Sequence, residues 1–269
     1  YSDVGYFTQQ TNDNGYIMLV SNSYSPFLLK LNESGNEEWR YYFYVNNYSK
    51  TYSALQDNDG NYIIPITDND ILDLVKIDEN GNLIWRRTVS YQDNIIKSIK
   101  EVDNGYIMSG YLDETLDRPL LIKIDVLGNL EWEYIDYNFL GNTIFNSVEQ
   151  TNDGGYITIG SSDGPSNSDS YNFLLAKFSG NGTSLWTKTF GSSCETDRGY
   201  DVKQTADNGY ILIGSTVSFG DFNYYTNIWL IKTDENGNEQ WNQVFGGPSS
   251  DYGKSIQITD DNGYIISGS

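Results

Sequence analysis

Apolar and polar residues alternate along short segments of this chain, and no segment keeps the 3.6-residue period of a helix. β-Branched and aromatic residues are frequent in these segments, and Asn-Gly pairs separate neighbouring segments as in tight hairpins. The pattern therefore predicts short antiparallel β-strands. In one stretch it predicts four consecutive strands, at residues 201–205, 209–215, 227–234 and 238–246.

The same four-strand pattern recurs along the chain. One motif, NGYI or a close variant, follows the turn between the first two strands, and a second motif ends in a tryptophan on the fourth strand. A lysine on the third strand stands nine residues before each tryptophan. The motif tyrosines are Tyr16, Tyr62, Tyr106, Tyr156, Tyr210 and Tyr264. The lysine–tryptophan pairs are Lys30 and Trp39, Lys76 and Trp85, Lys123 and Trp132, Lys177 and Trp186, and Lys232 and Trp241.

Repetition of one four-stranded unit predicts an all-β fold, a β-propeller of four-stranded antiparallel blades. A β-sandwich would not repeat one unit five times. The chain contains five complete units and a final strand pair, SIQIT and GYIISGS. This favours six blades, of which the last is incomplete in this chain. If further sequence continues the ring, seven or eight blades stay open. We expect a single domain over residues 1–269, with repeat units at approximately 1–45, 46–91, 92–138, 139–191, 192–247 and 248–269.

Length variation is confined to one kind of connection. The distance from the motif tyrosine to the lysine grows along the chain from 14 to 22 residues, so the connection between the second and third strands carries the long loops. In an antiparallel blade this loop and the link to the next blade leave by one edge, which we call the loop rim. The tight first–second and third–fourth turns leave by the other edge, which we call the hairpin rim. Because long loops on rigid scaffolds commonly carry binding sites, we expect any site on the loop rim.

The two longest loops, residues 161–172 and 215–227, supply the candidate ligand-binding residues. Exposed aromatic rings beside Asp and Asn suit stacking on sugars or anchoring a protein partner. The alternative is that these rings only pack on a neighbouring blade. The candidates are Asp163, Tyr171, Phe219, Asp221, Phe222, Tyr224 and Tyr225.

Three carboxylates, Asp93, Asp197 and Asp251, precede innermost strands and are candidate ligands for Ca²⁺ at a channel mouth. Thr143 stands at the corresponding place in the fourth unit, which leaves any such ring incomplete. Hydrogen bonding to the backbone of an adjacent blade is the alternative role. Apart from this possible Ca²⁺, we expect no cofactor.

Two further repeated features have structural interpretations. The turns at residues 78–82 and 234–238, both DENGN, lack the bidentate glutamate of a calcium loop and are interpreted as hairpin turns. The repeated lysines are interpreted as outward-facing strand residues near the Asp two positions on.

Composition narrows the function classes. With 16 basic and 37 acidic residues the formal net charge is −21, which disfavours nucleic acid and anionic membranes as partners. Histidine is absent and Cys194 is the single cysteine, so neither a Ser-His nor a Cys-His nucleophile can form. Paired carboxylates for glycoside hydrolysis stay open. No stretch approaches the roughly 20 apolar residues of a membrane span. Because the chain begins with Tyr1, we expect a processed product or part of a longer protein.

The combined motif resembles the propeller repeats of bacterial and archaeal secreted or cell-surface proteins. It joins SIQITDDNGYIISGS to WLIKTDENGNEQWNQVFGG, and the resemblance covers the whole chain. A more distant similarity is to quinoprotein-like propellers, whose docking motif also ends G-x-x-x-W. That similarity implies tryptophans packed between blades, here Trp39, Trp85, Trp132, Trp186 and Trp241, but the adjacent cysteine pair of many quinone-binding enzymes is missing.

These observations predict a non-catalytic propeller, extracellular or on the cell surface, that binds a protein or carbohydrate partner as an adhesion module. One alternative is a propeller glycoside hydrolase with paired carboxylates. Another is a structural subunit of a surface assembly, because an unfinished blade edge invites strand addition from a neighbour.

Overall fold

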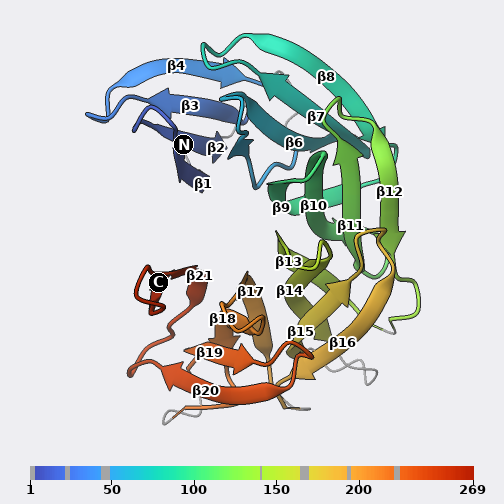
Figure 1. Cartoon of the computed structure of the whole chain (residues 1–269), viewed down its shortest axis with the longest axis vertical. Coiled ribbons are helices and arrows are strands. Elements are labelled where there is room, and N and C mark those ends of the chain that lie inside the picture. The colour runs from blue at the N-terminus through green and yellow to red at the C-terminus, as the bar shows by residue number, and fades with distance from the viewer. Residues whose placement is uncertain are drawn as a thin grey trace. The chain divides into compact units, whose positions relative to one another are not determined.

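The structure is a computed structural model that describes residues 4–21, 25–43, 49–139, 141–163, 170–192, 195–220 and 225–269. All its regular elements are β-strands, β1 to β22. The described part of the chain contains no helix with the length and hydrophobicity that a membrane span requires. The strands form five four-stranded sheets and one two-stranded sheet, as the repeat predicts (Figure 1).

Each four-stranded sheet, or blade, is made of four strands consecutive in the sequence. Blade 1 contains β1 (Val4–Gln10), β2 (Tyr16–Ser21), β3 (Phe27–Leu31) and β4 (Glu37–Tyr42). Blade 2 contains β5 (Leu55–Gln56), β6 (Tyr62–Asp68), β7 (Ile71–Ile77) and β8 (Leu83–Ser90). Blade 3 contains β9 (Asn94–Val102), β10 (Gly105–Leu112), β11 (Arg118–Asp125) and β12 (Leu130–Ile135).

The remaining strands repeat this order. Blade 4 contains β13 (Thr143–Gln150), β14 (Tyr156–Asp163), β15 (Tyr171–Phe178) and β16 (Ser184–Phe190). Blade 5 contains β17 (Asp197–Gln204), β18 (Tyr210–Thr216), β19 (Asn227–Thr233) and β20 (Glu239–Phe245). The last sheet is a half-blade of β21 (Gly253–Ile258) and β22 (Tyr264–Gly268).

The chain divides into two compact units. One comprises Tyr1–Glu114 and Ile122–Glu131, and the other comprises Thr115–Leu121 and Trp132–Ser269. Blades 1 and 2 lie wholly in the first unit, whereas blades 4 and 5 and the half-blade lie wholly in the second.

The turns of the hairpin rim follow from their Asn, Asp and Gly residues. Asp78 shows the chemistry: its Oδ1 accepts hydrogen bonds from the backbone N–H groups of Asn80 and Asn82. Gly81 has φ 82°, a left-handed conformation that glycine adopts without strain. The DENGN turns are therefore hairpin turns closed by their first aspartate.

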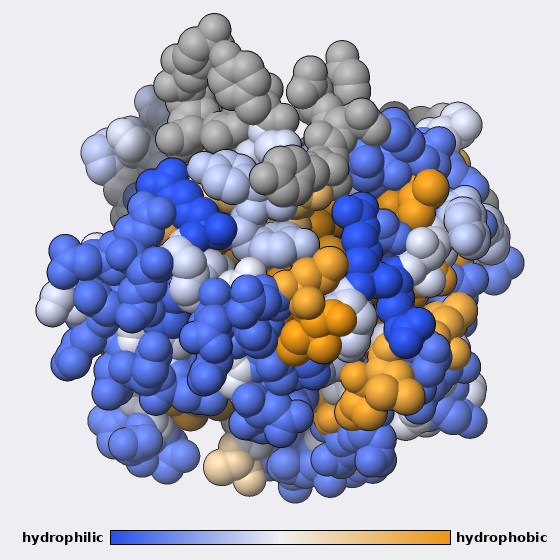
Figure 2. All heavy atoms as spheres, turned by 90° about the horizontal axis from the view of Figure 1, so that it is seen from above, coloured by the Kyte–Doolittle hydropathy of each residue, from blue (hydrophilic) through white to orange (hydrophobic). Residues whose placement is uncertain are grey.

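The second and third strands of each blade carry the core. Every residue of β18 is buried, and Ile17, Ile63, Ile157 and Ile211, each following a motif tyrosine, are fully buried. Sheets buried on both faces lose the simple alternation of a half-buried strand. Of the outer fourth strands, β4 and β16 alternate between exposed and half-buried residues. The face drawn in Figure 2 is mainly hydrophilic, with hydrophobic residues in small groups.

The tryptophan of a fourth strand packs on the next blade. The Trp39 ring lies over Gly81 and meets Tyr62 at 5.4 Å between ring centroids, and its Nε1 donates to the carbonyl of Glu79 at 3.0 Å. A Cβ on Gly81 would lie 2.9 Å from the ring, so the glycine is needed for space as well as for its φ. The same ring-over-glycine contact joins Trp85 to Gly128, Trp132 to Gly182, and Trp186 to Gly237.

The repeated lysines correct the sequence-based interpretation. The strand pattern predicts that they face outward, but all five are buried. The most exposed of them, Lys76, is 9 % exposed. Lys30 Nζ pairs with Asp13 at 2.8 Å and Glu38 at 2.9 Å, so its partner is an aspartate of the first turn rather than the residue two positions on. A buried ammonium needs such a partner because its desolvation is costly. The lysines are therefore core residues.

Candidate functional site

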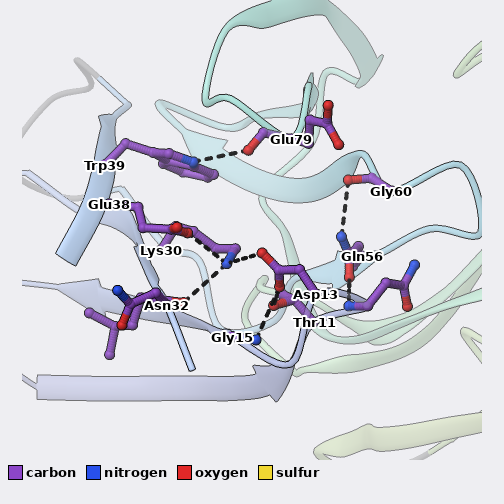
Figure 3. A network of polar contacts seen from close by, with 12 residues as sticks. Thr11, Asp13, Gly15, Lys30, Asn32, Glu38, Trp39, Gln56, Gly60 and Glu79 are labelled. Carbon is purple, nitrogen blue, oxygen red and sulfur yellow. Dashed lines mark hydrogen bonds and ion pairs between the residues drawn. The ribbon is translucent and has the colours of Figure 1, made fainter. Parts of the chain in front are cut away.

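A pocket of about 500 Å³ opens on the hairpin rim where blades 1 and 2 meet. Four turns or strand ends contribute to it: the β1–β2 turn, the start of β4, the β5–β6 turn and the β7–β8 turn. Figure 3 shows Trp39, Glu38 and Asp13 on blade 1, with Gln56, Gly60 and Glu79 on blade 2. The lining residues are Asn12, Asp13, Glu38, Trp39, Gln56, Asn58, Asp59, Gly60, Tyr62, Glu79 and Asn80.

Gln56 fixes the distance between the two blades in this pocket. Its Oε1 accepts a hydrogen bond from the backbone of Asn12 in blade 1 at 2.8 Å. Its Nε2 donates to the carbonyl of Gly60 in its own turn at 3.1 Å (Figure 3). Because both ends of the amide are used, Gln56 positions the pocket wall and is a poor candidate for binding a ligand directly.

Asp13 carries a fixed negative charge at the pocket. The hydrogen bonds from Lys30 and Thr11 lower the pKa of its carboxyl to about 2. The backbone N–H of Gly15 also donates to this carboxylate, at 3.1 Å. Asp13 therefore stays ionised at any pH near neutral and can accept hydrogen bonds, but it cannot act as a general acid there.

A second pocket, of about 480 Å³, lies at the equivalent place between blades 4 and 5. Gln204 repeats the bridge of Gln56: its Oε1 accepts from the backbone of Asn152 at 2.8 Å, and its Nε2 donates to the carbonyl of Asn208 at 3.3 Å. The lining residues are Asn152, Asp153, Lys177, Leu185, Trp186, Gln204, Asn208, Tyr210, Glu235 and Asn236.

The two pockets share a common set and differ at a few positions. An asparagine and an aspartate of the first turn, the docking tryptophan, the bridging glutamine, the motif tyrosine, and a Glu-Asn pair of the third–fourth turn occur in both. Leu185 stands where the first pocket has Glu38, and Lys177 reaches the second pocket. The first pocket is therefore the more acidic of the two.

Asp153 resembles Asp13 in its environment. Burial raises the pKa of its carboxyl, but hydrogen bonds from Thr151 and Lys177 outweigh that effect and lower the pKa to about 2. Lys177 Nζ lies 2.9 Å from Asp153 Oδ1. Both pockets thus present an aspartate that stays charged.

The loop-rim candidates are only partly described. Asp221, Phe222 and Tyr224 lie outside the described residues, as does Cys194. Phe219 packs on Trp229 at 4.8 Å between ring centroids, yet it remains 42 % exposed, as does Tyr225.

The other two loop-rim candidates lie in blade 4. Tyr171 lies 4.8 Å beneath the guanidinium of Arg198, so its ring already takes part in a cation–π contact. Asp163 accepts a 3.4 Å hydrogen bond from Asn142, while its Oδ1 is buried and has no hydrogen-bond partner among the described residues.

The predicted calcium ligands all have protein partners. Asp93 lies 3.1 Å from Lys50, which also pairs with Asp113 at 2.8 Å. In the described part of the chain, no group of three or more His, Cys, Asp or Glu side chains is placed to hold a metal ion. The β9–β10 turn is one residue shorter than the β17–β18 turn. The residue of blade 3 that is equivalent to Asp197, the first residue of β17, is therefore Asn94 and not Asp93.

Asp197 and Asp251 close the links between blades. Asp197 is fully buried and accepts hydrogen bonds from the Ser218 hydroxyl at 2.6 Å and the Ser192 backbone at 3.2 Å. Asp251 accepts from the backbone of Gly247 at 2.9 Å. These contacts match the backbone-bonding alternative considered for these aspartates.

The sequence contains a signal for the pockets that is independent of loop length. Gln56 and Gln204 each stand six residues before a motif tyrosine, and Glu79-Asn80 and Glu235-Asn236 each stand five to six residues before a docking tryptophan. Equal spacing from the repeat markers places these residues at the hairpin rim of their own blade. Loop length, in contrast, predicts a site on the opposite rim, the loop rim.

Comparison with known proteins supports the fold and no closer relationship. No protein-family model and no curated protein matches the chain. Drosophila Plexin A in complex with Semaphorin 1b is similar with a TM-score of 0.54 and 7 % identity over 99 % of this chain and 72 % of that chain. A mutant of the Synechocystis apocarotenoid oxygenase is similar with a TM-score of 0.51 and 8 % identity over 88 % of this chain. This chain spans 59 % of the length of that oxygenase. Together with the sheet topology, these similarities define the chain as a β-propeller.

Proposed function

We propose that this chain is a non-catalytic, extracellular or cell-surface binding module whose repeated pockets on the hairpin rim take carbohydrate. The observation that carries the proposal is the recurrence of one lining set in two pockets from different parts of the sequence. Volumes of about 500 and 480 Å³ fall within the roughly 300–1,000 Å³ typical of small-ligand sites.

The chemistry of the lining suits a polyhydroxylated ligand. Trp39, which is half-buried, offers aromatic surface to the apolar face of a sugar ring, and Asn80, Glu79 and Asp13 offer hydrogen-bond partners for hydroxyls. The net charge of −21 disfavours acidic glycans, so neutral or amino sugars are the expected class. The Glu38-containing pocket favours amino sugars more than the second pocket does.

The pocket acids favour binding over hydrolysis. A glycosidase needs one carboxyl with a raised pKa as acid and a second as nucleophile or base. Asp13 and Asp153 have lowered pKa values instead. Glu38 has no acidic counterpart in the second pocket, where Leu185 stands. Glycoside hydrolysis therefore stays the less supported alternative.

Two equivalent sites on one chain favour multivalent binding. A surface that displays many copies of one sugar can occupy both sites, so that dissociation from one pocket need not release the chain. Weak individual pockets would thus suffice for adhesion to a polymer or a cell surface, which agrees with the resemblance to surface propeller repeats.

A glycan array followed by titration calorimetry tests the proposal. The variant Glu79→Ala/Asn80→Ala removes hydrogen-bond partners from the first pocket, and Glu235→Ala/Asn236→Ala does so in the second. We expect each pair to remove about half of the binding sites, and the fourfold variant to lose binding by roughly tenfold or more, because several hydrogen bonds per site are lost.

The matched control is Glu33→Ala/Ser34→Ala in the equivalent β3–β4 turn. A Cβ added to the glycine of that turn, Gly35, would meet nothing within 4 Å, so no tryptophan packs on it. The control should bind like the unchanged protein. Binding that survives the fourfold variant would place the site elsewhere and reject the pockets.

A protein partner on the loop rim is the second candidate. It is favoured by Phe219 and Tyr225, each 42 % exposed at the base of one long loop. Loss of partner capture in Phe219→Ala, with glycan binding retained, would separate this role from the pockets.

A further inference from the structure

Blades 2 and 3 expose a group of large aliphatic side chains on the hairpin rim. Val126 and Leu127 form the tip of the β11–β12 turn and are 54 % and 59 % exposed. Ile84, which precedes the docking tryptophan of β8, is 48 % exposed. In the other four complete units the two tip positions carry charged or polar residues or glycine: Glu33-Ser34, Glu79-Asn80, Gly180-Asn181 and Glu235-Asn236.

These aliphatic side chains occupy places that line the first pocket between blades 1 and 2. Ile84 is equivalent to Glu38, because each is the extra residue of a β-bulge directly before the docking tryptophan. Residues 126–127 are equivalent to Glu79-Asn80, the turn tip of the next blade. The site that is polar between blades 1 and 2 is therefore apolar between blades 2 and 3.

The fourth strand of blade 2 and the turn of blade 3 are in direct contact. A Cβ on Gly128 would lie 3.0 Å from the Trp85 ring. Arg87 Nε donates a hydrogen bond to the carbonyl of Leu127 at 2.8 Å and so fixes the turn from its outer side. We call this surface the apolar junction and define it by four residues: Ile84, Trp85, Val126 and Leu127.

Two carboxylates border the apolar junction and lack a basic partner. Glu101 takes the place of the bridging glutamine, and its Oε2 accepts a hydrogen bond from the backbone of Asn58 at 2.8 Å. Asp59 stands where other first turns hold a lysine-binding aspartate, but Lys76 of its blade binds the buried Asp57 at 2.7 Å instead. Among the described residues, neither Glu101 nor Asp59 forms an ion pair with a lysine or an arginine.

Tyr106 shows that these charges lie close together. It is the motif tyrosine of blade 3, and its equivalent Tyr62 lines the first pocket. The Tyr106 hydroxyl donates to Asp57 Oδ2 at 3.0 Å. Burial raises the pKa of this hydroxyl, and the negative charges of Asp57, Glu101 and Asp59 raise it further. The junction therefore combines aliphatic side chains with negative charge that no lysine or arginine neutralises.

We propose that the apolar junction docks a peptide segment of another protein, one that carries aliphatic side chains next to lysine or arginine. The aliphatic groups of the segment pack on Ile84, Val126 and Leu127, and its basic group pairs with Glu101 or Asp59. Burial of exposed aliphatic surface supplies affinity, whereas the carboxylates select a basic partner. The four residues of the junction belong to the lining of neither carbohydrate pocket, so this site acts independently of them.

A second copy of this chain is a poor occupant. A two-fold contact would bring the same surface of both copies together, so Glu101 and Asp59 of one copy would face their own equivalents. Each copy also has a net charge of −21, and repulsion between like charges opposes such a contact. The expected occupant is therefore a basic segment of a different protein.

A short synthetic peptide that repeats the pattern Lys-Leu-Leu is the probe. Two matched peptides of the same length repeat Lys-Ser-Ser and Glu-Leu-Leu, so each lacks one of the two required properties. Fluorescence anisotropy of the labelled peptides with the full chain should show saturable binding of the first peptide, at least roughly tenfold tighter than that of either matched peptide. Sodium chloride should weaken this binding, because it screens exposed charges.

Variants of the junction locate the binding. Val126→Thr/Leu127→Asn removes the apolar tip without adding charge and should weaken binding roughly tenfold or more, because two aliphatic side chains no longer contribute. Glu101→Gln should weaken it about threefold and reduce its salt dependence, since an exposed ion pair is lost. This variant keeps the hydrogen bond to the next turn, as Gln56 and Gln204 make it elsewhere.

The control is Tyr91→Ser, which removes an 80 % exposed ring from the link between β8 and β9 on the loop rim. It should bind the peptide like the unchanged protein. Circular dichroism checks that each variant is folded, and glycan binding by the two pockets should be the same in all of them.

Four results would overturn the proposal. One is no binding of the Lys-Leu-Leu peptide up to about 1 mM. The second is equally tight binding of either matched peptide, and the third is binding that Val126→Thr/Leu127→Asn leaves unchanged. The fourth is a dimer that forms without peptide and is lost in the same double variant, which would show that a second copy covers the junction.

Discussion

At the scale of single residues, the third-strand lysines depend on aspartates that are distant in sequence. Lys30, Lys177 and Lys232 each bind an aspartate 17 to 25 residues earlier in the chain. The same aspartates accept a hydroxyl of a threonine two residues before them, as Thr205 donates to Asp207 at 2.5 Å. One carboxylate thus closes the first turn and neutralises a buried ammonium of the third strand.

These ion pairs predict a loss of stability in acid. The hydrogen bonds from Thr205 and Lys232 lower the pKa of Asp207 from 3.8 to about 2 in the folded chain. Because the pKa of Asp207 is lower in the folded chain than in the unfolded chain, the ionised carboxylate stabilises the fold. This stabilisation is present above about pH 4 and is lost as the pH falls toward 2. The free energy of unfolding, measured by urea titration at each pH, should be nearly constant from pH 7 to about 4.5 and should fall below about pH 4.

Asp207→Asn and Asp261→Asn separate the lysine contribution from that of the turn. Both variants disturb the threonine and glycine hydrogen bonds, but only Asp207 holds a lysine. We expect Asp207→Asn to cost about 1 kcal/mol more than Asp261→Asn at pH 7, a modest figure because the Asp207 side chain is 55 % exposed. Equal costs would show that the ion pair adds nothing.

At the scale of elements, the innermost strands β1, β9, β13, β17 and β21 share a β-bulge. The register shifts between Phe145 and Ser147 in β13 and between Gly199 and Asp201 in β17. The bulged residue contacts a neighbouring blade: Lys254 of β21 lies 3.7 Å from the ring of Tyr200, and Lys97 of β9 lies 3.7 Å from the ring of Tyr52. Bulges therefore add cation–π contacts between neighbouring blades.

The bulge explains the glycine four residues after the motif tyrosine. At Gly214 an added Cβ would lie 2.0 Å from the carbonyl oxygen of Arg198, and at Gly160 it would lie 1.8 Å from that of Ile144. Both clashes are with backbone, which cannot move aside as a side chain can. In blades 4 and 5 the last glycine of the G-Y-I-x-x-G spacing is therefore a packing requirement, whereas in blade 1 Val20 takes this place opposite Gly5.

Gly214→Ala should destabilise the chain by roughly 1–3 kcal/mol or more through this overlap. Gly5 is the control, because nothing lies within 4 Å of a Cβ there and its φ is ordinary. Gly5→Ala should be neutral or stabilise by up to about 1 kcal/mol, since it restricts the unfolded chain. Thermal unfolding of both variants would measure the contrast, and similar melting temperatures would contradict the bulge argument.

At the scale of the whole molecule, the net charge of −21 works against the folded state through self-repulsion. Added salt screens that repulsion and also weakens the ion pairs of the buried lysines. The excess of acidic over basic residues makes the first effect the larger one.

The melting temperature should therefore rise with sodium chloride between about 10 and 300 mM. A gain of about 1 kcal/mol would correspond to about 2–4 °C for a chain of this size. Differential scanning calorimetry at several salt concentrations checks the sign. A fall in melting temperature would mean that the ion pairs dominate.

The sequence by itself determined the blades. Strand periodicity, Asn-Gly turns and the fixed Lys–Trp spacing are local properties, and hairpin geometry depends on neighbouring residues. The five four-stranded sheets, the final strand pair and the tight third–fourth turns could all be predicted for this reason. The start of β17 at Asp197 was missed, because polar residues at the head of that strand hide its alternation.

Only the tertiary structure decided which side chains meet across blades. Burial of Lys30 depends on Asp13 and Glu38, and the first pocket needs four turns or strand ends from two blades. Such contacts join residues that are far apart in the chain, and their distance depends on how sheets pack. Loop length pointed to the loop rim, whereas the described pockets lie on the hairpin rim. Each pocket forms where the tryptophan of one blade packs against the glycine turn of the next blade. It cannot be predicted from one repeat, because its lining residues come from two.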